Sequence, residues 1–114
     1  MNRIRVNRVE ESPENPREGY SYRRLVEHGE GVPFNFLTVS VQERHKTRRV
    51  IDGIRNYFVV SGSGHFVVED EEIEVRAGTL ITIWPDETYS YQGEMELIEF
   101  NVAIDGKIGH EDIE

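Results

Sequence analysis

The chain has 114 residues and a mass of 13.3 kDa, which suffices for one domain and excludes two. Its composition, 37% hydrophobic, 10% aromatic and 31% charged, is typical of a domain that buries its own core. The absence of cysteine excludes disulfides, thiol catalysis and cysteine-ligated metals. No apolar run approaches the roughly 20 residues that cross a bilayer, and the charged segment 1–10 does not fit a signal peptide. We therefore expect a cytoplasmic protein with no membrane partner.

Charge is distributed unevenly along the chain. The net charge of -9 argues against a nucleic-acid partner, which calls for a basic footprint. Residues 1–60 carry 11 basic and 8 acidic side chains, whereas residues 61–114 carry 2 basic and 14 acidic ones. The basic residues cluster between positions 44 and 55, with Glu43 and Asp52 nearby. This cluster is either solvated charge paired with acidic neighbours or a small cationic site on an acidic protein.

Hydrophobic residues alternate along most of the chain. The first 19 residues, with Pro13, Pro16 and Gly19, predict an N-terminal arm. Residues 62–64 are expected to form a hairpin turn, and residues 85–87 to break the chain. We expect an all-β barrel over residues 20–104, followed by a loose acidic tail over 105–114. The predicted strands are 22–26, 35–41, 55–60, 65–68, 73–76, 79–84, 88–91 and 95–102.

The segment 56–91 resembles the cupins. The resemblance depends on the glycine and hydrophobic framework of residues 57–64 and 73–80, and on the Trp-Pro pair that follows. It implies a double-stranded β-helix, a jelly-roll-like barrel. Cupins commonly form dimers, so the resemblance also implies a homodimer, to which the arm could add an edge strand.

The residues at the cupin metal-ligand positions differ from those of the family. With Gly62 as the anchor of the first cupin motif, the glutamate position falls on Arg55. The two histidine positions fall on Arg48 and Val50, or on positions 49 and 51 if the gap is shorter. With Gly78 as the anchor of the second motif, the last histidine position falls on Tyr89.

These residues predict a metal-free protein. A guanidinium group has no lone pair and repels a divalent cation, and a phenol ligates only after losing a proton with a pKa near 10. We therefore expect no metal and no other cofactor. A shifted site would have to draw on residues without metal-ligand spacing, namely His28, His45, Asp52 and His65.

Strand alternation predicts what replaces the metal. If position 55 faces inward, so do positions 57 and 59, and the same holds for 89 and 91. Guanidinium groups suit carboxylates or phosphates, and phenols suit sugars or aromatic rings. Alternatively, Arg55 forms an internal ion pair with Asp52 or Glu99, and the tyrosines only fill the barrel. The predicted ligand-binding residues are Arg48, Arg55, Tyr57, Tyr89 and Tyr91.

Several functions are compatible with this pocket. The first is a metal-free cupin that binds a polar or anionic small molecule, such as a sugar or a carboxylate, without necessarily transforming it. The second is a metal-free sugar isomerase or epimerase, for which His65 is the candidate base. The remaining alternatives are a metal-dependent cupin with shifted ligands and a domain that binds no small ligand.

Overall fold

The computed structural model describes residues 3–114 and contains an all-β chain, which confirms the predicted fold class. A 3-10 turn, Val9–Glu11, precedes the first strand. No helix in residues 3–114 is long and apolar enough to cross a bilayer. The strands within this range are β1 (Glu14–Arg17), β2 (Tyr20–Val26), β3 (Phe34–Val41), β4 (Arg44–Asp52), β5 (Ile54–Val68), β6 (Glu71–Arg76), β7 (Leu80–Ile83), β8 (Thr88–Val102) and β9 (Gly109–Asp112).

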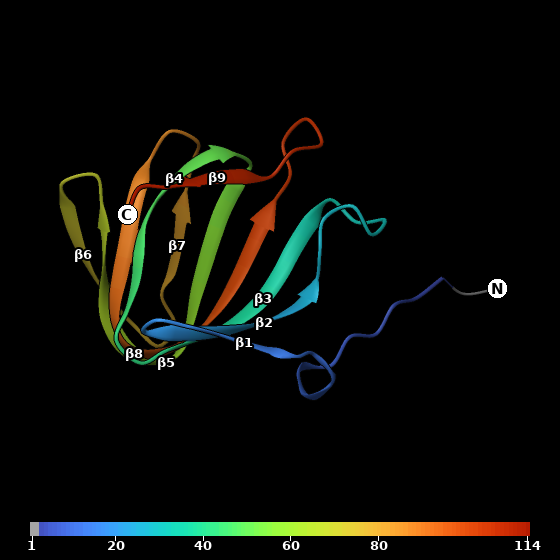
Figure 1. Ribbon diagram of the computed structural model, residues 1–114, viewed down its shortest axis with the longest axis horizontal. Coiled ribbons are helices and arrows are strands. Elements are labelled where there is room, and N and C mark those ends of the chain that lie inside the picture. Colours follow the sequence, from blue (N-terminus) through green and yellow to red (C-terminus); the bar gives the residue numbers. More distant parts are fainter. Residues whose placement is uncertain (1–2) are drawn as a thin grey trace.

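The two longest strands, β5 and β8, pair antiparallel along nearly their whole length, from Ile54–Val102 to Val68–Tyr89. The end of β8 near Val102 also pairs with β3, and its start near Thr88 pairs with β4. Similarly, β5 pairs first with β7 and then with β6. β5 and β8 therefore belong to both halves of a curled sheet, with β1, β2 and β3 on one side and β4 and β9 on the other (Figure 1).

Three glycines allow β5 and β8 to bend together. A Cβ atom at Gly62 would lie 2.2 Å from the carbonyl oxygen of Glu94, and one at Gly64 would lie 2.2 Å from that of Gln92. Gly93, opposite Gly64, has a φ of +139°, a region that favours glycine. The predicted hairpin turn at 62–64 is wrong, because β5 continues through these residues. The predicted strands 88–91 and 95–102 are likewise a single strand, β8.

Alternation along β5 and β8 determines which side chains form the interior. Tyr57 is fully buried, whereas its neighbour Phe58 is 39% exposed on the outer face. Tyr89 and Tyr91 are buried as well, so the inward direction expected for the odd positions of both strands is found. The core also includes Tyr20, Val39, Val41, Val50, Val59, Phe66, Val75, Ile83, Met95 and Leu97.

Strands β4 and β9 were not predicted from the sequence. β4 lies between β8 and β9, and its basic side chains pair with β9 carboxylates: Arg48 with Asp112 and Arg49 with Glu111, each at 2.9 Å. The expectation of a loose tail is therefore wrong for Gly109–Asp112. The basic residues 44–49 pair with carboxylates at the end of the chain rather than with their sequence neighbours, whereas Arg55 of the same cluster forms no such pair within residues 3–114. β1 similarly forms an ordered hairpin with β2 within the expected arm.

Substitution of Gly62 by alanine tests the close packing of β5 on β8. Both Gly62→Ala and Gly78→Ala place an alanine at positive φ, +82° and +92°, but only Gly62 faces backbone atoms. We expect the free energy of unfolding to fall by about 1 kcal/mol for Gly78→Ala and by about 3 kcal/mol for Gly62→Ala. Urea denaturation measures both, and equal losses would contradict the steric explanation.

Candidate functional site

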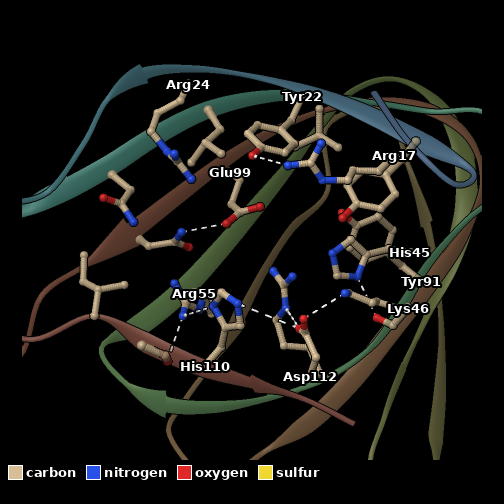
Figure 2. Close-up of a pocket in the computed structure, with 18 residues that line it drawn as sticks. Arg17, Tyr22, Arg24, His45, Lys46, Arg55, Tyr91, Glu99, His110 and Asp112 are labelled. Atoms are coloured by element: carbon tan, nitrogen blue, oxygen red, sulfur yellow. Dashed lines mark hydrogen bonds and ion pairs between the residues drawn. The ribbon is translucent and has the colours of Figure 1, made fainter. Parts of the chain in front are cut away.

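A cavity of about 530 Å³ lies between β1, β2 and β3 on one side and β4 and β9 on the other (Figure 2). Its size is that of a small-molecule site. Two carboxylates line it, together with more basic than acidic side chains, although the whole chain carries a net charge of -9. The basic residues in its lining are Arg17, Arg24, Lys46, Arg48 and Arg55.

Arg55 is a buried cation without a carboxylate partner. Its side chain is among the buried residues, at 3% exposure, and one Nη donates to the carbonyl oxygen of Gly109 at 2.8 Å. The same group lies 3.3 Å from His110 Nδ1. Within residues 3–114 the Nε has no hydrogen-bond partner, and Arg55 forms no direct ion pair with Asp52 or Glu99. Burying an uncompensated charge costs several kcal/mol. An anionic group bound in the cavity would reduce that cost.

The two carboxylates of the cavity are already engaged. Glu99 accepts a hydrogen bond from the Asn101 amide at 2.6 Å. Asp112 accepts hydrogen bonds from Lys46 Nζ at 2.8 Å and from Arg48 Nε at 2.9 Å. These two cations lower the pKa of Asp112 to about 2, so the carboxylate is ionised at neutral pH.

His45 is a buried imidazole in the cavity wall. Its ring stacks on Tyr91, with 4.7 Å between centroids and 18° between planes. Nδ1 lies 2.7 Å from the carbonyl oxygen of Lys46. Because a carbonyl can only accept, Nδ1 carries the hydrogen and Nε2 keeps its lone pair. Burial, assisted by the charge of Arg48, lowers the pKa of His45 to about 4, so the ring is a neutral base at pH 7.

Of the cavity tyrosines, Tyr91 has a buried hydroxyl that no group in the described part of the chain, residues 3–114, hydrogen-bonds. Burial raises its pKa well above 10, so it remains a phenol that can donate. Tyr57 and Tyr89 do not line the cavity. Their hydroxyls are 2.6 Å apart and bond to each other in the core, where burial raises the pKa of Tyr89 to about 12.

The structure thus distributes the predicted site residues over two places. Arg48, Arg55 and Tyr91 line the cavity, whereas Tyr57 and Tyr89 lie in the packed core. That any of them binds a ligand stays a prediction. His65, the candidate base, lies on the β5–β6 hairpin outside the cavity lining, with its Nε2 3.7 Å from Glu72.

Sequence reasoning did not identify His45 as a base. The paired register of β4 with β8 shifts between His45 and Arg48, so a bulge places two residues with odd spacing on the same face. Strict alternation along β4 therefore does not predict that His45 and Arg48 lie on the same face of the strand. Tyr20 and Tyr22, which also line the cavity, could have been found from the alternation along β2.

The positions that hold a metal in cupins do not fit one here. Arg48 and Arg55 offer guanidinium groups, and Tyr89 is a phenol bonded to Tyr57. Within residues 3–114 no group of three or more His, Cys, Asp or Glu side chains could hold a metal ion.

The buried His45 predicts a pH dependence of stability. Its folded pKa of about 4 lies below the ordinary 6.5, so the unfolded chain takes up the proton first as the pH falls. We expect stability to be full above pH 6.5 and to decline towards pH 4, by about 3 kcal/mol from His45. His110, with a pKa also near 4, contributes in the same window.

Urea denaturation at several pH values measures this effect, with NMR titration of the imidazole signals as a direct check. His45→Gln should remove more of the decline than His110→Gln, because His110 is half-exposed. A His45 ring that titrates near pH 6.5 would contradict the buried neutral base.

Comparisons with known proteins agree with this fold. No protein-family model and no curated sequence matches the chain. Among solved structures, the chain is similar to Streptomyces Pac13, which is described as a nucleoside dehydratase. The structure of a histidine-to-glutamine variant of Pac13 with uridine shares 25% sequence identity with this chain and superposes with a TM-score of 0.81. The match covers 98% of this chain and 95% of that one.

Two further structures share the fold at lower identity. The polyketide cyclase RemF from Streptomyces resistomycificus has 15% identity and a TM-score of 0.75, over 100% of this chain and 86% of that one. KdgF from Halomonas sp. has 12% identity and a TM-score of 0.75, over 90% and 97%. This chain is a small cupin-like domain.

Proposed function

We propose that the cavity binds a polar or anionic molecule of the nucleoside type, and that His45 removes a proton from it in a metal-free loss of water. The observation that carries this proposal is the neutral imidazole of His45, whose tautomer leaves Nε2 free. The buried Arg55 without a carboxylate supports an electron-rich ligand. The similarity to Pac13, a nucleoside dehydratase solved with uridine, supports the substrate class and the reaction.

Loss of water from a β-hydroxy carbonyl compound can use the groups of this cavity in two steps. His45 Nε2 first takes a proton from the carbon beside the carbonyl, and the electrons of that C–H bond move to the carbonyl oxygen. Tyr91 donates a hydrogen bond to this oxygen, and the charge of Arg55 stabilises the enolate. The enolate then re-forms the carbonyl and expels the β-hydroxyl, which takes the proton from the His45 imidazolium and leaves as water.

Each group in this scheme belongs to the chain itself, which supports the metal-free form of the proposal. Burial keeps Tyr91 protonated, so it remains a donor at neutral pH. An isomerase or epimerase would begin with the same removal of a proton and would return the proton to carbon instead of expelling water. The product therefore distinguishes dehydration from these reactions.

His45→Gln tests the proposed base. The substrates are nucleosides oxidised to carry a carbonyl beside a C–H bond and a hydroxyl on the next carbon, and mass spectrometry detects loss of one water. We expect the wild-type chain to dehydrate at least one of them and His45→Gln to lower kcat by about 10²–10⁴-fold. His65→Gln is the matched control and should keep the wild-type rate, because His65 lies outside the cavity lining.

Dialysis against a chelator should leave the rate unchanged. Full activity in His45→Gln, or loss of activity in His65→Gln alone, would overturn the assignment of the base. A product of unchanged mass would replace dehydration by isomerisation or epimerisation.

A further inference from the structure

The mouth of the cavity carries two arginines on either side of one aromatic ring. Tyr22 lies between Arg17 and Arg24, whose guanidinium carbons are 5.1 Å and 5.5 Å from the ring centroid. Arg17 also donates to the Tyr22 hydroxyl at 3.1 Å and to the carbonyl oxygen of Pro16 at 2.8 Å. Figure 2 shows the three side chains in a row along β1 and β2. The ring thus holds both cations at the rim.

Neither rim cation forms a direct ion pair within residues 3–114. The charge of Arg24 acts on Glu30 without such a contact: Arg5 is the main cause of the lowered pKa of Glu30, and Arg24 contributes to it. Arg23, between Tyr22 and Arg24 in sequence, has the contrasting environment. It lies on the other face of β2, where it pairs with Glu14 at 3.6 Å and donates to the carbonyl oxygen of Ser12. Alternation along β2 therefore places the ion-paired Arg23 outside and Arg24, which has no direct ion pair within residues 3–114, at the cavity.

Neither carboxylate of the cavity forms an ion pair with the rim cations within residues 3–114. Asp112 is bound by Lys46 and Arg48, and Glu99 accepts a hydrogen bond from Asn101, whose amide is neutral. Because the five cations of the lining outnumber its two carboxylates, an excess of positive charge remains at two places, on Arg55 in the interior and on the pair at the mouth. A ligand that matches both places is electron-rich at the reacting end and carries a formal anion at the exposed end.

We propose that Arg17 and Arg24 bind a phosphoryl group at the mouth, so that the ligand is a nucleoside monophosphate rather than an uncharged nucleoside. This inference rests on the proposed function for the nucleoside part of the ligand. A phosphate monoester carries about two negative charges at neutral pH, and the charges of the two guanidinium groups at the rim attract such an anion. The exposed rim leaves the phosphate partly hydrated, so its desolvation cost stays small.

Binding of uridine, uridine monophosphate and inorganic phosphate, measured by calorimetry on the full chain, tests the proposal. We expect the monophosphate to bind at least about tenfold more tightly than uridine, with an advantage that shrinks as salt is added. The double variant Arg17→Gln/Arg24→Gln should abolish this advantage, so that uridine and its monophosphate bind it with equal affinity. The control Arg23→Gln should retain it.

Equal affinity for uridine and its monophosphate, or an advantage that persists in the double variant, would overturn the rim site. The nucleoside part can fail separately. Suppose that inorganic phosphate binds, that this binding requires Arg17 and Arg24, that uridine monophosphate binds no more tightly than inorganic phosphate, and that uridine does not bind. The phosphoryl site then stands, and the nucleoside-type function falls. If none of the three ligands binds, both proposals fall.

Discussion

The close pairing of β5 with β8 is the constraint on which the rest of this structure depends. The two strands cross both halves of the curled sheet, and at the bend their backbones approach so closely that Gly62, Gly64 and Gly93 leave no room for a Cβ atom. Glycine has the least steric resistance to such an approach and the greatest loss of freedom on folding. The three glycines therefore lose conformational entropy on folding, and in return β5 and β8 can bend and extend through both halves of the curled sheet.

That pairing also determines the chemistry of the interior. Once Val59 lies in the core, alternation brings Tyr57 and Arg55 to the same side, and β8 brings Tyr91 from the opposite strand. The hydroxyls of Tyr57 and Tyr89 satisfy each other in the core. Arg55 and Tyr91 line the cavity, and each has a buried polar atom that no group within residues 3–114 binds. The same alternation thus supplies side chains both to the packed core and to the cavity wall.

Local pattern sufficed for the all-β fold and for the inward direction of Arg55 and Tyr91, because both depend on a period of two. The cupin resemblance depended instead on the glycine and hydrophobic framework of residues 57–64 and 73–80, which is also local. Local pattern did not predict β4, because this strand has few apolar residues. Its basic residues pair with carboxylates more than 60 positions later in the chain, as Arg48 does with Asp112 at a separation of 64. Such long-range pairing has no local signature. The bulge after His45 also interrupts the alternation along β4. Residues 62–64 were mispredicted as a hairpin turn because glycine-rich segments of this composition are typical of turns.

The charges of the cavity and the basicity of His45 are linked through Arg48. Burial is the first cause of the low His45 pKa, and the nearby Arg48 cation is the second. Asp112 binds Arg48 and opposes the second cause only in part. An anionic ligand would add negative charge beside the same imidazole and favour its protonated form. On the proposed function, the base is therefore weakest in the empty cavity and strengthens when an electron-rich substrate is bound, when proton removal is required.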